Sequence, residues 1–215
     1  MPSHKELGGI VASTGTELEV KFYMSDLPGL KAKLEKMGVQ CVQERVHEVN
    51  LRFDTPDQAL KQKSQVLRLR KDRDCRLTYK GPGHTLDGAT LRTELEFTVG
   101  DFNTAKAFIE ALGYQVMLMY EKYRAVYALG EVLVTLDEMP FGYFAEIEGP
   151  TGDAIQHAAL QLGLDWETRI LDSYMALFER ARTALGFNFR DLSFENFANL
   201  PVPEVALGVS QADHE

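Results

Sequence analysis

The stretch ELEVKFY, residues 17–23, alternates charged and apolar side chains at every second position. A period of two is typical of a β-strand, because successive side chains point to opposite faces of the sheet. One face of this strand therefore carries two glutamates and a lysine, whereas the other carries leucine, valine and phenylalanine. The stretch predicts a strand with one charged face and one apolar face.

Similar period-two runs recur along the chain and predict roughly eight strands. Tight turns, such as the one at residues 72–74, join neighbouring runs, so these strands are expected to be antiparallel. The runs cover residues 41–54, 66–70, 75–80, 90–99, 116–129, 132–137 and 143–148. Apolar residues at helical spacing predict helices over residues 26–38, 101–112, 153–162 and 167–185. The sequence therefore predicts an α+β fold.

Two segments of the chain repeat the same order of elements. ELEVK at residues 17–21 and ELEFT at residues 94–98 are each followed by a predicted helix that stops at a glycine, Gly38 or Gly113. Further strands follow in both halves. We infer an internal duplication.

The polar positions of these strands are almost all arginine, lysine or glutamate. For any single strand, a solvated outer face is the simpler interpretation. The amphipathic helices, however, need an apolar surface to cover, which leaves the charged face turned toward the inside of a curved sheet. If the strands close, they form an antiparallel eight-stranded β-barrel, a tunnel with a charged and wet interior that is flanked by helices.

Pairs of glutamates recur on this charged face. Glu17 and Glu19 lie on one strand, about 7 Å apart by the strand rise, and Glu146 and Glu148 repeat the spacing on a distant strand. A lone Glu-x-Glu pair is more often part of a solvated strand than of a metal site, but several such pairs together with Asp137 favour a divalent cation. Oxygen ligands without histidine or cysteine indicate Mg²⁺ or Mn²⁺.

The basic residues of the same face exceed what ion pairing with these carboxylates requires. Guanidinium groups bind phosphate oxygens in a bidentate manner, and a triphosphate with its metal ions satisfies both signs of charge at once. The predicted chemistry is phosphoryl or nucleotidyl transfer. The basic residues concerned are Arg68, Arg70, Lys80, Arg92, Lys122 and Arg124.

Charge and composition argue against other partners. The 215 residues carry a formal net charge of −9, which is unfavourable for binding nucleic acid or an anionic membrane surface. No apolar run approaches the roughly 20 residues of a membrane span, and residues 1–5 lack the apolar run of a secretory signal. We therefore expect a cytoplasmic protein. Cys41 and Cys75 have no metal-type spacing.

The ordered motifs of the chain resemble those of the CYTH superfamily, also called triphosphate tunnel metalloenzymes. ELEVK at residues 17–21 is similar to the family signature Glu-x-Glu-x-Lys. The other matching pieces are HEVN (47–50), FDTPD (53–57), LRLR (67–70), LTYKGP (77–82), ELE (94–96), EKYR (121–124), LDE (136–138) and EIEG (146–149). The overall pattern is most similar to the class IV adenylyl cyclases of this superfamily.

This resemblance implies roles for individual residues. Catalysis would involve Glu17, Glu19 and Lys21. Metal would be held by Glu17, Glu19, Asp137, Glu146 and Glu148, and triphosphate by Lys21, Arg68, Arg70, Lys80, Arg92, Lys122 and Arg124. The family's thiamine triphosphatases pair a lysine with a tyrosine just before the aromatic-Asp-Thr-Pro segment. Lys21 matches that lysine, but Arg52 occupies the place of the tyrosine, which disfavours the thiamine activity.

Several alternatives stay open at this level. The substrate could be tripolyphosphate, ATP or thiamine triphosphate, and the reaction could be hydrolysis or the cyclisation of ATP to cyclic AMP and pyrophosphate. A non-catalytic module that binds nucleotide or polyphosphate is a further alternative. We expect residues 1–15 to be a flexible leader, residues 16–186 the tunnel domain, and residues 187–215 a C-terminal arm and loose tail. The apolar stretch 202–209 could dock on a partner subunit and form a homodimer.

Overall fold

The strands of the computed structural model, which describes residues 14–213, follow the period-two runs of the sequence. They are β1 (Thr14–Met24), β2 (Gln40–Asp54), β3 (Val66–Lys71), β4 (Cys75–Lys80), β5 (His84–Leu86), β6 (Ala89–Val99), β7 (Gln115–Leu129), β8 (Val132–Met139) and β9 (Gly142–Glu148). The helices are α1 (Leu27–Lys36), α2 (Ala59–Gln62), α3 (Phe102–Ala111), α4 (Gly152–Gln161), α5 (Tyr174–Leu185), α6 (Phe194–Phe197) and α7 (Glu204–Leu207), with a 3-10 turn at Trp166–Thr168.

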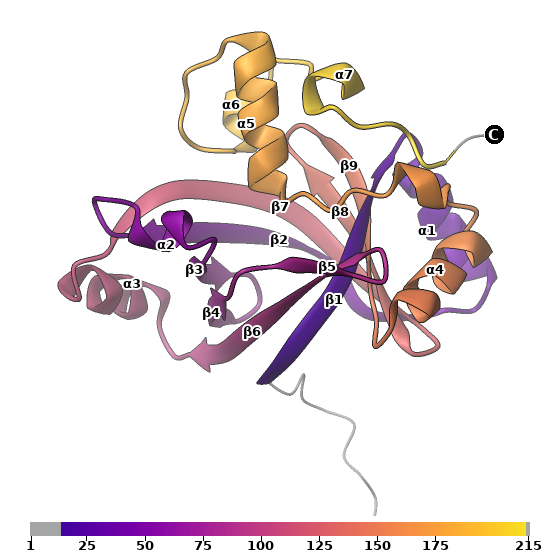
Figure 1. Cartoon of the computed structure of the whole chain (residues 1–215), viewed down its shortest axis with the longest axis horizontal. Helices are drawn as coiled ribbons and strands as arrows, with labels where there is room; N and C mark the ends of the chain where they lie inside the picture. Colours follow the sequence, from indigo (N-terminus) through magenta and orange to yellow (C-terminus); the bar gives the residue numbers. More distant parts are fainter. Residues whose placement is uncertain (1–13, 214–215) are drawn as a thin grey trace, which may run out of the picture.

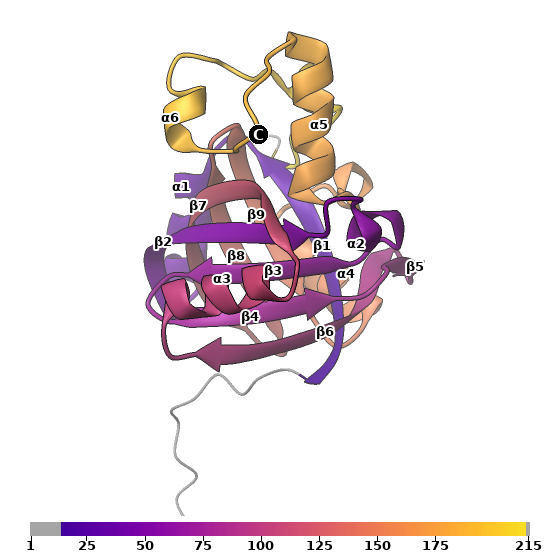
Figure 2. The same cartoon turned by 90° about the vertical axis from the view of Figure 1, so that its left-hand side faces the viewer.

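Eight strands close into a ring (Figures 1 and 2). The order around it is β1-β9-β8-β7-β2-β3-β4-β6, and β1 also pairs with β6, which joins the two ends of the sheet. Strand β1 makes both pairings by using residues 14–19 against β6 and residues 19–24 against β9. The short strand β5 adds to β6 outside the ring. The predicted antiparallel eight-stranded tunnel is confirmed.

The ring is built from two similar halves. The order β1-α1-β2-β3-β4 recurs as β6-α3-β7-β8-β9, as the inferred duplication requires. Equivalent strands pair across the two halves at β1–β6 and at β2–β7, and the pairs β1–β9 and β4–β6 also join the halves. Each half therefore supplies four strands of the closed tunnel.

The apolar faces of the strands point outward, and helices cover those of β1, β9 and β3, whereas Leu95 and Phe97 of β6 stay exposed. Helices α1 and α4 lie on the outside of β1 and β9, where Phe22, Leu34 and Ile155 are fully buried (Figure 1). Helix α3 covers β3 through Ile109 and Leu69. Because the helices bury the apolar face, the charged positions of the same strands face the interior of the ring.

The helix expected over residues 167–185 begins only at Tyr174. Ile170 is still extended and exchanges two backbone hydrogen bonds with Lys21 of β1. The Ser173 side chain then accepts a hydrogen bond from the amide of Ala176 and caps the helix. The tertiary pairing with β1 therefore overrides the helical pattern of residues 169–172.

Residues 187–213 pack on the tunnel instead of forming a loose tail. Leu192 bridges to Tyr120 of β7, and both Leu192 and Leu207 are fully buried in an aromatic cluster with helix α5. At the end of this segment, the Asp213 carboxylate accepts hydrogen bonds from the amides of Ser25 and Asp26. Part of the apolar stretch 202–209 is therefore used within its own chain.

The beginning of the chain is described only from residue 14. The predicted leader lies mostly outside the described residues, but Thr14 already belongs to β1 and pairs with Leu95, so the strand begins two residues before the expected Thr16. Within residues 14–213, no helix combines the length and the apolar character that a membrane crossing needs.

Replacing Leu192 with alanine tests whether the C-terminal segment contributes to the folded core. Since this side chain is fully buried, we expect the free energy of unfolding in urea to fall by about 2–4 kcal/mol. The matched control is Val205→Ala, because Val205 is 84% exposed, and its effect should stay within about 0.5 kcal/mol. Equal effects of the two variants would contradict the packing described.

Candidate active site

The charged positions of the strands line a cavity of about 740 Å³ inside the ring. All the predicted site residues except one lie on its wall: Glu17, Glu19, Lys21, Arg68, Arg70, Lys80, Arg92, Lys122, Arg124, Glu146 and Glu148. Asp137 is the exception, because it is fully buried behind Lys122 and Arg124. Closure of the ring thus brings together residues that are up to 131 positions apart, from 17 to 148.

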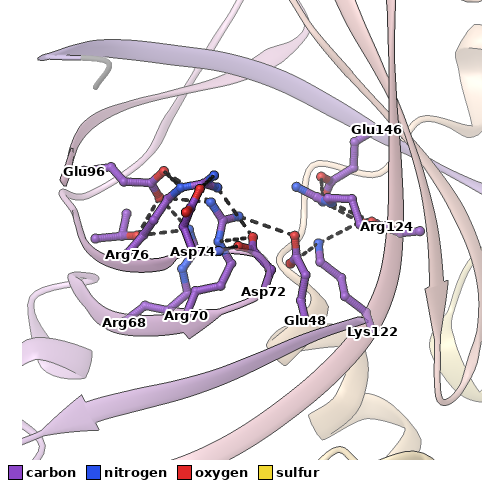
Figure 3. Close-up of polar contacts among 12 residues, drawn as sticks. Glu48, Arg68, Arg70, Asp72, Asp74, Arg76, Glu96, Lys122, Arg124 and Glu146 are labelled. Atoms are coloured by element: carbon purple, nitrogen blue, oxygen red, sulfur yellow. Dashed lines mark hydrogen bonds and ion pairs between the residues drawn. The ribbon is translucent and has the colours of Figure 1, made fainter. Parts of the chain in front are cut away.

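On one side of the cavity, three guanidinium groups from β3 and β4 converge on Glu96 of β6 (Figure 3). Nη2 of Arg70 lies 3.2 Å from a Glu96 oxygen, and Nη2 of Arg68 lies 3.4 Å from the other. The Thr78 hydroxyl donates to the same carboxylate at 2.7 Å. Glu96 therefore holds the arginine side chains in place within the cavity.

On the opposite side, Asp137 of β8 is the anion around which cations gather. Nζ of Lys122 donates to it at 2.9 Å, Nε of Arg124 at 2.7 Å, and the Tyr174 hydroxyl of α5 at 2.9 Å. Arg124 also pairs with Glu146 (Figure 3). Burial and the neighbouring Asp137 charge raise the pKa of Tyr174 well above its ordinary value, so its hydroxyl remains a hydrogen-bond donor.

Glu48 of β2 connects these two groups, although the sequence pattern alone does not single it out. Its carboxylate lies 3.6 Å from Nη1 of Arg70 and 3.9 Å from Nζ of Lys122, and the residue is 1% exposed (Figure 3). Burial opposes ionisation, but the charges of Lys122, Arg124 and Arg70 outweigh it and lower the pKa of Glu48 to about 2. Glu48 belongs to the HEVN motif at residues 47–50. Register shifts in the first half of β2, however, obscure which residues of this strand face inward.

Carboxylates outnumber cations where β1, β6 and β9 meet. Glu17 contacts Lys80 at 2.6 Å, Glu19 contacts Lys21 at 2.6 Å, and Glu148 lies opposite Glu19 in the β1–β9 ladder. Burial raises the pKa of Glu17 despite the opposing effect of Lys80. Although Glu148 remains exposed at the end of β9, partial desolvation and the charges of Glu17 and Glu19 together raise its pKa to about 7. Negative charge is therefore in excess at this point.

The carboxylates expected to hold a metal differ in the number of ion pairs that they make. Within residues 14–213, no three Asp, Glu, His or Cys side chains already converge as a metal site. Asp137 and Glu146 are each bound by two cations, whereas Glu17 and Glu19 each contact a single Lys and Glu148 has no ion-pair partner among the described residues. Glu17, Glu19 and Glu148 fit a hard divalent cation better, because they supply only oxygen and their mutual repulsion is reduced when such a cation binds. They are the residues that could hold Mg²⁺ or Mn²⁺.

Removing the Asp137 charge tests its role as the buried anion. Asp137→Asn leaves Lys122 and Arg124 without their closest carboxylate, and breaking such a buried pair should lower the free energy of unfolding by about 3–5 kcal/mol. Asp74→Asn is the matched control, because the Asp74 side chain is 62% exposed and pairs only with Arg76. A loss of stability no larger than that of the control would refute this role.

The Glu148 pKa predicts how stability depends on pH. Because folding raises this pKa from 4.5 to about 7, the proton stabilises the fold, and stability is lost as pH rises from about 5 to 7. The Glu148→Gln variant cannot lose a proton at this position, so its stability does not fall in this pH range. In the presence of a metal chelator at pH 8, its free energy of unfolding should exceed that of the wild type by about 1–2 kcal/mol after allowance for solvent screening. At pH 5 the two should be nearly equal.

The control for that comparison is Glu131→Gln, which removes an exposed carboxylate from the β7–β8 turn. Thermal unfolding at pH 5, 6, 7 and 8 would give the difference between each variant and the wild type. A difference for Glu148→Gln that does not grow with pH would contradict the crowding of carboxylates at this position.

The sequence and the fold place this charged tunnel in a known family. The CYTH domain family matches residues 15–174, and the chain belongs to this family. Adenylate cyclase CyaB of Aeromonas hydrophila is 28% identical over 180 residues, covering 78% of this chain and 91% of the relative. The proposed resemblance to the CYTH superfamily is confirmed.

Solved structures show the same fold. A Vibrio parahaemolyticus protein, provisionally called an adenylate cyclase, superposes with a TM-score of 0.70 at 22% identity, over 78% of this chain and 99% of that one. The Hippeastrum protein HpAC1, also provisionally called an adenylyl cyclase and described as having a dominant triphosphatase activity, gives a TM-score of 0.57 at 19% identity, over 76% and 94%. At these identities the likeness concerns the fold.

Proposed function

We propose that this protein is a divalent-metal-dependent enzyme that hydrolyses a triphosphate, inorganic or organic, inside its tunnel. The observation that carries the proposal is the distribution of charge in the cavity, where Glu17, Glu19 and Glu148 form an acidic region and most of the Lys and Arg side chains lie on the rest of the wall, partly neutralised by Glu48, Glu96 and Glu146. A metal–triphosphate complex has both signs of charge and matches this arrangement. The HpAC1 triphosphatase activity supports the same class of reaction.

Each group of residues has a distinct task in this proposal. Lys21, Arg68, Arg70, Lys80, Arg92, Lys122 and Arg124 would bind phosphate oxygens and offset the charge that develops during transfer. Glu96, Asp137 and Glu48 would keep these cations in position through the contacts described. Mg²⁺ or Mn²⁺, held by Glu17, Glu19 and Glu148, would supply further charge neutralisation at the phosphates.

Cyclisation of ATP to cyclic AMP and pyrophosphate is a second candidate. It is favoured by the similarity to adenylate cyclase CyaB and by apolar residues at one end of the cavity. Val42 and Leu133 line the cavity and are 47% and 39% exposed, so this end offers an apolar surface to a nucleoside. An inorganic substrate has no apolar part that could contact such a surface.

A product assay separates these activities. The purified chain would be incubated with tripolyphosphate, ATP or thiamine triphosphate and either metal, and orthophosphate, pyrophosphate and cyclic AMP would be quantified. We expect orthophosphate release, and we expect the double variant Glu17→Gln and Glu19→Gln to lower turnover by at least about 100-fold, because it removes two candidate metal ligands. The control is Glu131→Gln, which should leave turnover unchanged.

Two results would overturn the proposal. Unchanged turnover in the double variant would show that the acidic region does not take part in the reaction. Tight binding of a triphosphate without any product in the wild type would instead indicate a non-catalytic binding module. Cyclic AMP accompanied by pyrophosphate would favour the cyclase.

A further inference from the structure

Two guanidinium groups in the cavity are not balanced by carboxylates. The other Lys and Arg side chains on the cavity wall each have a carboxylate oxygen within 3.9 Å. Arg52 of β2 and Arg92 of β6 are the exceptions, since neither has a carboxylate oxygen within 4.0 Å among residues 14–213, although Arg92 lies opposite Glu17 in the β1–β6 ladder. Both side chains are partly buried, and a cation that is removed from water without a partner is unfavourable, so these two positions favour a ligand of opposite charge.

Arg52, Arg68 and Arg92 lie close to one another. Arg52 and Arg68 are direct neighbours across the β2–β3 ladder. The Nε atoms of both Arg68 and Arg92 are buried and have no hydrogen-bond partner. Burial lowers the pKa of Arg52, and the charges of Arg68 and Arg92 lower it further against the opposing effects of Tyr120 and Asp54, as expected for three cations that lie close together.

The acidic residue nearest to Arg52 in the sequence does not neutralise it. Asp54 is two positions further along β2, but its carboxylate accepts hydrogen bonds from the backbone amides of Thr55, Leu60 and Lys61. It therefore orders the turn into α2 and makes no ion pair with the Arg52 guanidinium, although its charge favours the protonated arginine.

The start of helix α5 adds positive potential to the same end of the cavity. Ser173, Tyr174 and Met175 line the same cavity as Arg52 and Arg92. The Thr90 hydroxyl, on the same strand as Arg92, donates to the carbonyl of Leu171 just before the helix. Helix N-termini favour anions through their unpaired amides. The nearby Asp172 does not cancel this effect, because its carboxylate is bound by Arg180.

We propose that Arg52 is a further substrate-binding residue, which together with Arg68 and Arg92 holds the terminal phosphate of a triphosphate at the α5 end of the tunnel. This inference rests on the proposed function. An unesterified terminal phosphate has the highest charge of the chain and three free oxygens, which suits several guanidinium forks. The acidic region and the apolar end of the cavity then face the rest of the substrate.

The test is calorimetric titration of tripolyphosphate into the wild type, Arg52→Gln and Arg52→Lys, with and without Mg²⁺. We expect Arg52→Gln to weaken binding about tenfold or more, in line with the loss of one charge-assisted contact. Arg52→Lys should recover part of the affinity, because it keeps the charge but not the bidentate geometry. Arg45→Gln is the control, since Arg45 pairs with Glu138 and is 51% exposed.

Thermal unfolding of the ligand-free protein separates a binding role from a structural one. Removing an unpaired and repelled cation should leave the melting temperature unchanged or raise it, whereas losing a structural arginine would lower it. If Arg52→Gln binds tripolyphosphate as tightly as the wild type, or if its ligand-free form melts at a lower temperature, the proposed role of Arg52 is overturned. The proposed function of the protein is not affected by either result. A wild-type protein that binds no triphosphate would reject the proposed function and this inference with it.

Discussion

The structure depends on the burial of many charged side chains inside a closed ring of strands. Moving a charge out of water is unfavourable unless a partner of opposite sign replaces the lost hydration. The tunnel meets this requirement with ion pairs that cross between strands, such as Lys122 with Asp137 and Lys80 with Glu17. Glu48 extends the network between Arg70 and Lys122. The interior is therefore ordered by electrostatics, while apolar packing takes place on the outside of the ring.

The compensation inside the tunnel is incomplete in two places, and their signs are opposite. Carboxylates are crowded at Glu17, Glu19 and Glu148, and guanidinium groups at Arg52, Arg68 and Arg92, and the two groups adjoin where Glu17 lies opposite Arg92 in the β1–β6 ladder. A folded protein tolerates such imbalance where a ligand relieves it, and strongly perturbed pKa values tend to occur at functional sites. Both imbalances lie on the wall of one cavity, which makes a ligand with both signs of charge, a metal–triphosphate complex, the best match.

The C-terminal segment is linked to this site through helix α5. Residues of the aromatic cluster, including Leu192 and Phe197, pack against the helix whose first residue, Tyr174, donates to Asp137 inside the tunnel. The family match ends at residue 174, so residues 187–213 lie beyond it. Their packing on α5 helps to determine where Tyr174 lies relative to Lys122 and Arg124, which extends the influence of this segment to the cavity wall.

The alternating pattern of residues 17–23 and its repeats determined the strands, their charged and apolar faces and the identity of most cavity residues. The physical reason is that the direction of a side chain in a strand follows directly from its position in the sequence. The pattern could not show which carboxylates are free, since Asp137 and Glu148 have the same side-chain chemistry in the sequence but opposite surroundings in the fold. The importance of Arg52 and Glu48 likewise emerged only when ring closure set their neighbours. Pairing between distant strands, which local periodicity does not encode, decided the balance of charge at each point in the tunnel.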